Sequence, residues 1–132
     1  MTPRRFPLLL FAAALAGCVS PSGGGPICTT SIEPAVIVKA HDAVTGENLI
    51  PGIRGALHDG TYVDSLRPTV FSDGLVPVAL SGAPERPGRY RVELVHPGYR
   101  NVTLVGIEVR EGICHVETQT VDAAMEAESA LR

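Results

Sequence analysis

The sequence predicts an all-β fold, a single antiparallel sandwich or barrel that covers residues 28–121. Turn-forming residues recur about every eight to twelve positions in this range, which is the spacing expected of short antiparallel strands. The stretch RYRVELV alternates cleanly, so we expect Tyr90, Val92 and Leu94 to face the core and the charged residues between them to face solvent. No internal repeat is visible, and we predict a single domain.

The first half of the domain is predicted to begin with three strands. AVIVKAHD is the first, with Val36, Val38 and Ala40 on its inner face, and the turn residues of DAVTGENLIPG end it. IRGALHD and TYVDSL follow, joined at Asp59 and Gly60, a dipeptide preferred in tight hairpins.

The second half is predicted to contain four more strands and a tail. LVPVAL is placed at a sheet edge because Pro77 cannot donate to a strand ladder. RYRVELV comes next, and NVTLVGIEV returns beside it with a bulge near Gly106. ICHVETQTV closes the domain with Cys114 and His115 on opposite faces, which weakens them as a shared nucleophile or metal pair. Residues 122–132, rich in Ala and Glu, are expected to form a short helical or disordered tail.

The N-terminal segment has the features of a secretory signal peptide, which we place at residues 1–17. Two arginines precede an apolar run over residues 6–15, which is too short to span a bilayer as a stable helix. The residues LAGC that end at Cys18 resemble the bacterial lipobox. The resemblance implies cleavage before Cys18 and lipidation of its thiol, giving an anchor that carries several acyl chains such as palmitate. Residues 18–27, rich in Ser, Gly and Pro, would then be a flexible tether.

The charge and aromatic content exclude some partners. After removal of residues 1–17, nine basic residues face fourteen acidic ones, so the formal net charge is −5. With no long basic run, nucleic acid is not expected as a partner. Aromatic residues make up 5% of the chain and tryptophan is absent. Few side chains are therefore present to form a surface on which bases or sugars could stack.

The cysteine count points to a disulfide. The chain has three cysteines, and lipidation of Cys18 would leave Cys28 and Cys114 as a pair in an oxidising compartment. We therefore predict that these two are bonded, closing a loop worth roughly 4 to 5 kcal/mol in the chain-entropy estimate.

A second resemblance rests on turn and core residues spaced along residues 35–121. These residues are Asp42, Ala43, Thr45 and Gly46 in the first turn, Gly88, Tyr90 and Val92 further on, and Gly98 with Tyr99. The pattern resembles the carboxypeptidase regulatory-like domains of the transthyretin-like β-sandwich superfamily. It implies a Greek-key sandwich of seven or eight strands. It says little about activity, because one fold can host many functions.

Two activities known in that superfamily fit this chain poorly. Its hydrolases of 5-hydroxyisourate end in Tyr-Arg-Gly-Ser, whereas this sequence ends in ESALR. Its adhesion modules can crosslink a first-strand lysine to a last-strand asparagine. Lys39 lies in the first strand here, but the last strand offers no asparagine.

Histidines and carboxylates at strand ends are the remaining candidates for chemistry. His41 and His58 each precede an aspartate, and His96 and His115 complete the set. Because strand ends cluster in a sandwich, a divalent-metal site is an open alternative, yet no zinc-type ligand spacing is present. Aspartates at turns are ordinary turn residues. We therefore expect no catalytic residue, no metal site and no cofactor.

The expected function is a non-catalytic lipoprotein of the cell envelope, a binding or structural module. Cys18 would attach it to the membrane. In Gram-negative bacteria an aspartate after the lipidated cysteine is the usual signal for retention in the inner membrane. This chain has Val19 there, which favours the outer membrane, facing the periplasm. Exposed loops such as GAPERPG would contact an envelope protein or a polysaccharide. The alternative is a periplasmic protein that binds a small ligand or a divalent metal, and a transthyretin-like hydrolase ranks below it.

Overall fold

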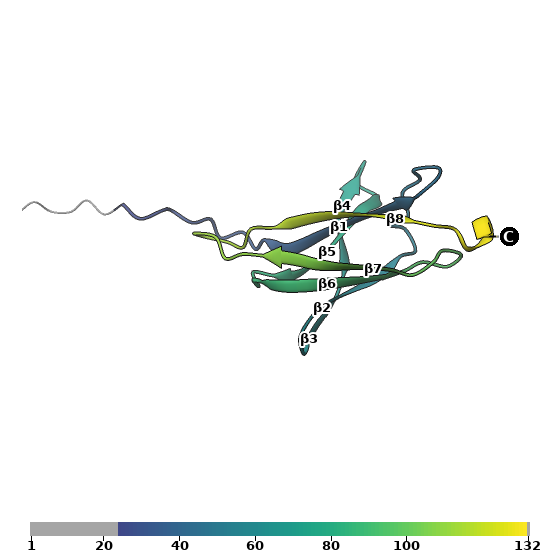
Figure 1. Ribbon diagram of the computed structural model, residues 1–132. Helices are drawn as coiled ribbons and strands as arrows, with labels where there is room; N and C mark the ends of the chain where they lie inside the picture. Colours follow the sequence, from purple (N-terminus) through teal and green to yellow (C-terminus); the bar gives the residue numbers. More distant parts are fainter. Residues whose placement is uncertain (1–23, 132) are drawn as a thin grey trace, which may run out of the picture.

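A computed structural model describes residues 24–131, and within them the chain folds into a β-sandwich. The predicted signal peptide at 1–17, Cys18 and the first part of the tether lie outside the described residues. One four-stranded sheet has the order β4 (Arg67–Ser72), β5 (Val76–Pro84), β1 (Pro34–Asp42) and β8 (Gln119–Met125). The other has the order β3 (Tyr62–Ser65), β2 (Arg54–Asp59), β6 (Gly88–Val95) and β7 (Val102–Val109). The two sheets lie face to face (Figure 1), so the predicted all-β fold is confirmed.

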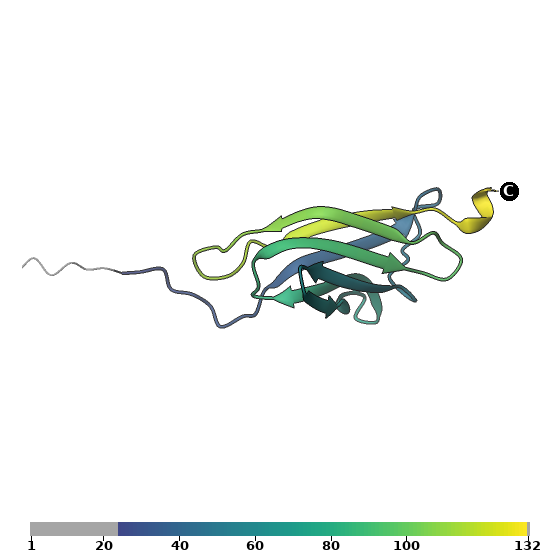
Figure 2. The same cartoon turned by 60° about the horizontal axis from the view of Figure 1, so that its bottom comes forward.

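The strand connections alternate between the two sheets. The hairpins β2–β3 and β6–β7 belong to one sheet and the hairpin β4–β5 to the other, while β8 returns to lie parallel to β1. Residues 24–33 lead into β1 at one end of the sandwich, and the chain ends at the opposite end (Figure 2). None of the residues 24–131 belongs to a helix with the length and hydrophobicity that a membrane span requires.

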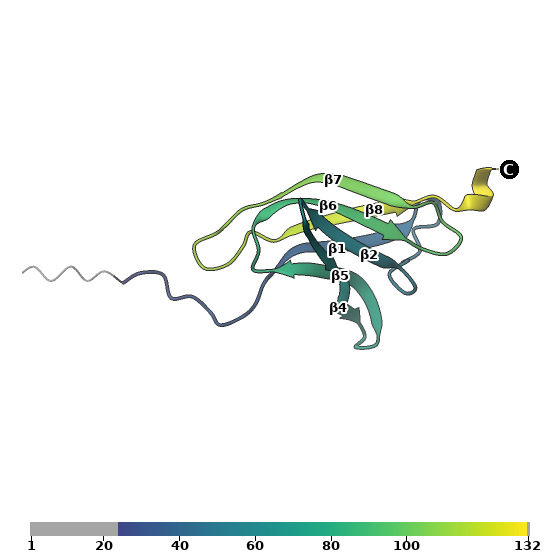
Figure 3. The ribbon, with the colours of Figure 1, turned by 90° about the horizontal axis from the view of Figure 1, so that it is seen from below.

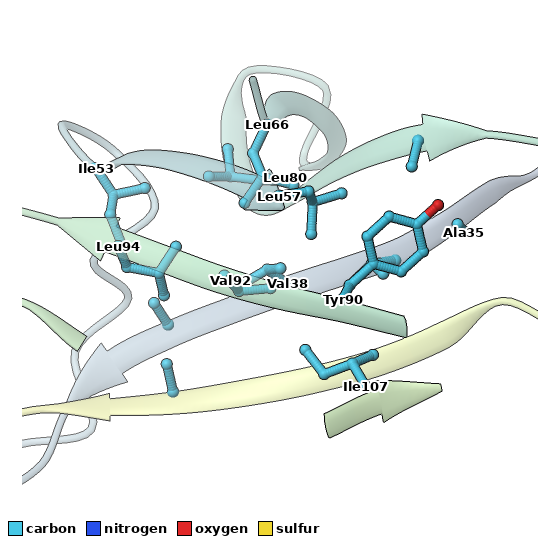
Figure 4. Packing of buried hydrophobic residues seen from close by; sticks show 14 of the residues in the cluster. Ala35, Val38, Ile53, Leu57, Leu66, Leu80, Tyr90, Val92, Leu94 and Ile107 are labelled. Atoms are coloured by element: carbon cyan, nitrogen blue, oxygen red, sulfur yellow. The ribbon is translucent and has the colours of Figure 1, made fainter. Parts of the chain in front are cut away.

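The core lies between the sheets and is built from the inner faces of their central strands. Tyr90, Val92 and Leu94 of β6 are each 1% exposed or less, as the alternation of RYRVELV predicted (Figure 4). Val36 and Val38 of β1 are fully buried opposite them. Burial of each such side chain contributes about 1.5 to 3 kcal/mol, so these alternating stretches account for much of the folding energy.

Two predicted backbone features are confirmed. The predicted β2–β3 hairpin is present, with Asp59 paired to Tyr62. Its two turn residues are Gly60, which has a φ of +57°, and Thr61, one position later than Asp59–Gly60. The β6–β7 register shifts between Tyr90 and Val92, opposite a segment in which Gly106 has a φ of +75°. That is the bulge predicted near Gly106.

The strand β4 was not predicted, and its presence changes the position of β5. β4 forms a hairpin with β5 through Asp73 and Gly74, which have φ values of +47° and +73°. β5 therefore lies between β4 and β1 and is not an edge strand, so that prediction was wrong. Pro77 is tolerated because pairing of β5 with β1 ends at Leu80, so β4 is the only strand paired with β5 at Pro77. The carbonyl of Pro77 accepts a hydrogen bond from the Asn48 side chain.

The last strand begins later than predicted. β8 runs over Gln119–Met125, so the strand occupies the start of the predicted tail, and a short 3₁₀ helix follows at Glu128–Leu131. Ala123 and Met125 are buried against the core, and this burial overrides the helix propensity of an alanine-rich segment. Cys114 and His115 accordingly lie in the loop before β8, and not on opposite faces of a strand.

Candidate functional site at the disulfide end of the sandwich

A disulfide joins the segment before β1 to the loop between β7 and β8. Cys28 and Cys114 are bonded, with their Cα atoms 5.3 Å apart, as predicted. We call residues 24–33 the arm and residues 110–118 the β7–β8 loop. The loop is closed by a bridge between Glu111 and Val116. The disulfide thus fastens the exposed arm to one end of the sandwich.

His115, next to the disulfide, connects the arm to the end of β5. Its Nδ1 lies 2.7 Å from Oε1 of Glu85, and its Nε2 lies 3.0 Å from Oγ1 of Thr29. A carboxylate only accepts hydrogen bonds, so Nδ1 carries a proton that it donates to Glu85. In the neutral imidazole Nε2 then accepts from the Thr29 hydroxyl, and in the imidazolium it donates to that hydroxyl. Thr29 is in turn 2.8 Å from the hydroxyl of Ser31. We call Thr29, Glu85 and His115 the His115 clasp.

Glu85 is the centre of the clasp. Its Oε1 accepts a hydrogen bond from the Glu33 N–H at 2.7 Å, and its Oε2 accepts one from the Val116 N–H at 3.4 Å. The Glu33 hydrogen bond, followed by His115, lowers the pKa of the Glu85 carboxyl against the opposing effect of desolvation. Glu85 has a φ of +51° and Ala83 one of +53°, values that few L-residues adopt. The backbone is therefore locally strained at Ala83 and Glu85, in the conformation that places this carboxylate.

The order hydroxyl, imidazole, carboxylate is also that of a nucleophilic triad. In this array, however, every group ties one chain segment to another. Glu85 holds backbone N–H groups of the arm and of the β7–β8 loop, and Thr29 is bonded to Ser31 as well as to His115. We therefore interpret the His115 clasp as a structural fastening of the arm that acts together with the disulfide.

The GAPERPG loop, through which a partner contact is expected, is fixed to the sandwich by Arg86. The Arg86 guanidinium lies 2.6 Å from Oδ2 of Asp59 and donates to the Tyr90 hydroxyl at 3.0 Å. The hydrogen bond to Asp59, followed by that to Tyr90, raises the pKa of Arg86. The guanidinium also lies over the Tyr62 ring, 3.9 Å from its centroid. With Glu85 in the clasp as well, both charged residues of GAPERPG are engaged within the chain.

Asp42 is a turn residue in the structure. Its Oδ1 accepts from the N–H groups of Val44 and Thr45 at 2.8 Å, and its Oδ2 accepts from the Tyr99 hydroxyl at 2.8 Å. These hydrogen bonds lower the pKa of Asp42 to about 2, with the largest effect from Thr45, followed by Tyr99 and Val44. Asp42, Thr45 and Tyr99, which all belong to the second resemblance, therefore meet in one structural corner.

The four histidines do not come together. His41 lies 2.8 Å from Asp122, His58 lies 3.3 Å from Glu93, His96 contacts the carbonyl oxygens of Pro51 and Pro97, and His115 belongs to the clasp. Nε2 of His58 is buried without a hydrogen bond, because the approach of Glu93 has the distance but not the geometry of one. Among residues 24–131, no three His, Cys, Asp or Glu side chains are grouped to hold a metal ion.

Sequence reasoning missed Glu85 and Thr29 as partners of His115. They are separated from it by 30 and 86 positions, so no local spacing connects them. The predicted Cys28–Cys114 bond was the one signal available, because it brings Thr29 and His115, the next residue along each chain segment, to the same place.

No protein-family model matches the chain, and no curated protein matches it either. The resemblances to the lipobox and to carboxypeptidase regulatory-like domains therefore rest on the residues given for them. Both stay predictions.

Proposed function

We propose that the protein is a non-catalytic lipoprotein of the cell envelope, anchored through Cys18 and presenting its sandwich as a binding or structural module. The observation that carries the proposal is the Cys28–Cys114 disulfide. It accounts for two of the three cysteines, and the remaining one is the residue that the LAGC sequence marks for lipidation. A structural disulfide also belongs to an oxidising compartment, which agrees with export.

The arrangement of the arm supports the same proposal. Sixteen positions separate Cys18 from the first residue of β1, a length that could reach at most about 58 Å if fully extended. The disulfide and the His115 clasp hold the arm on the sandwich, so the anchor would connect to a fixed end of the domain. Val19 after the cysteine favours the outer membrane, with the domain in the periplasm.

Intact mass of the protein extracted from membranes tests the proposal. With Cys18 acylated, the mass exceeds that of the chain from residue 18 by the acyl groups. Two thiols should then react with an alkylating agent, and only after reduction. The Cys18→Ala variant is the matched control, and it should lose the acyl mass and the membrane association while keeping the two reducible thiols. An unmodified Cys18 in the wild type would overturn the anchor.

A further inference from the structure

The β4–β5 hairpin stands out from the body of the sandwich (Figure 3). It carries large apolar side chains in solvent. Val70, Phe71 and Val76 are 41%, 49% and 46% exposed, and Leu75 is 85% exposed. Single exposed apolar residues are normal, but a group of four on one projecting element marks a contact surface. We call residues 70–76 the finger.

An apolar groove lies at the base of the finger, on the outer face of the sheet that contains β1 and β5. Its volume is about 430 Å³. The apolar lining comes from Ile32, Pro34, Ile37, Val70 and Pro84, and the polar lining from Arg67, Thr69 and Ser81. Val70 belongs to both features, so the finger and the groove form one continuous surface.

Two charges at the ends of this surface are complementary to each other. Arg67 lines the groove and Asp73 lies at the fingertip, and among residues 24–131 neither has an oppositely charged side chain within 4 Å. Each is three positions from Val70. A two-fold axis at Val70 would bring Arg67 of each copy opposite Asp73 of the other. Such self-complementarity is the geometric requirement of an isologous dimer.

We propose that the chain forms a two-fold homodimer in which the finger of each copy lies in the groove of the other. An Arg67–Asp73 ion pair closes each end of the interface, and Val70 lies at its centre. The contact is made by side chains, because Pro68 and two register shifts in β4 oppose pairing of this edge with another strand.

A second copy fits this surface better than a bilayer does. Insertion of the fingertip into lipid would carry the Asp73 carboxylate into an apolar phase, which is costly. In the dimer the same carboxylate meets a guanidinium at the rim. The surface is small, so the dimer belongs to the weak class of interfaces, with a dissociation constant on the order of micromolar. The proposal is independent of the lipid anchor.

Exchange of the two charges tests the ion pairs. Sedimentation equilibrium over about 1 to 200 µM gives the dissociation constants of the wild type, Arg67→Glu, Asp73→Lys and the double variant. Each single exchange places like charges together at both ends of the interface, so the dissociation constant should rise about tenfold or more. The double variant restores opposite charges and should return to within about threefold of the wild type. A monomeric wild type throughout this range, or a double variant as weak as the singles, would overturn the proposal.

Crosslinking at the axis gives a second readout. In the dimer, Val70 of one copy lies beside Val70 of the other, so Val70→Cys should form an intermolecular disulfide under mild oxidation. Val105→Cys, at a site 72% exposed on β7 of the opposite sheet, is the matched control and should remain monomeric. The wild type shows any background from Cys18. Equal crosslinking at positions 70 and 105 would reflect chance encounter in a shared micelle and would contradict the two-fold arrangement.

Discussion

Removal of the Cys28–Cys114 disulfide should lower the free energy of unfolding by an amount that depends on the His115 clasp. The bond joins residues 86 positions apart, and release of that constraint stabilises the unfolded chain by about 4.6 kcal/mol in the chain-entropy estimate. In the folded state the arm also gains freedom without the bond. If about two residues near Cys28 become mobile, they regain about 2 kcal/mol of conformational entropy.

The free energy of unfolding should therefore fall by about 4.5 kcal/mol if the clasp keeps the arm in place. If the arm comes free, its regained entropy offsets about 2 kcal/mol and the decrease is about 2.5 kcal/mol. The measurement is urea unfolding of the wild type and of Cys28→Ser/Cys114→Ser, followed by far-UV circular dichroism. With a slope of about 1.5 kcal/mol per molar urea, the midpoint should fall by roughly 1.5 to 3 M. The strands should keep their circular dichroism signal, because both cysteines lie outside the eight strands of residues 24–131.

Reduction of the wild type is the matched control for the double variant, since it opens the bond without changing a side chain. The two should give the same midpoint. A loss below about 1 kcal/mol would refute the reasoning, because it would mean that the bond constrains neither the unfolded chain nor the arm.

Three further predictions concern single side chains. The folded-state pKa of Asp42, about 2 against the usual 3.8, lies below the unfolded value, so its stabilisation is complete above about pH 4 and is lost as pH falls toward 2. Urea midpoints of Asp42→Asn and wild type should therefore converge over that interval, and a constant difference would contradict the assignment. Tyr90→Phe should cost about 1 to 2 kcal/mol in urea unfolding, because the buried hydroxyl donates to the Arg86 carbonyl at 2.7 Å; an unchanged midpoint would show that this bond contributes nothing. His115→Ala should speed amide hydrogen exchange at Glu33, whose N–H donates to Glu85, while residues 90–94 stay protected. Equal protection of Glu33 in both proteins would rule out the clasp.

The parts of the fold that could be predicted are those that depend on local pattern. The alternation in RYRVELV identified the inner face of β6, and the Asp59–Gly60 dipeptide identified the β2–β3 turn, because side-chain direction and turn conformation are set by neighbouring residues. The Cys28–Cys114 bond was predictable for a different reason, since an even pair in an exported chain has few alternatives.

The parts that were missed depend on what lies next to them in space. β4 gives no alternating signal, because its side chains are mostly exposed and Pro68 interrupts it. The end of β8 was placed too early, at residue 121, because Ala123 and Met125 have helix propensity, and their burial beside β1 is visible only after folding. The Glu85 contact with His115 joins segments 30 positions apart, for which the sequence has no periodic signal.

The disulfide, the His115 clasp and the finger have complementary consequences if the chain is anchored as proposed. The disulfide and the clasp lie at the end of the sandwich where the arm enters β1 (Figure 2), so a pull on the anchor reaches the β7–β8 loop before it reaches the start of β1. The finger itself projects from a different part of the body (Figure 3), whereas the groove that receives the finger of the other copy reaches Ile32 of the arm. Confinement to one membrane raises the effective concentration of neighbouring copies, which favours weak contacts that dilute solution would not sustain. A dimer of micromolar strength is therefore sufficient for an anchored protein, and deletion of the anchor should make dimerisation more dependent on protein concentration without changing its charge-exchange pattern.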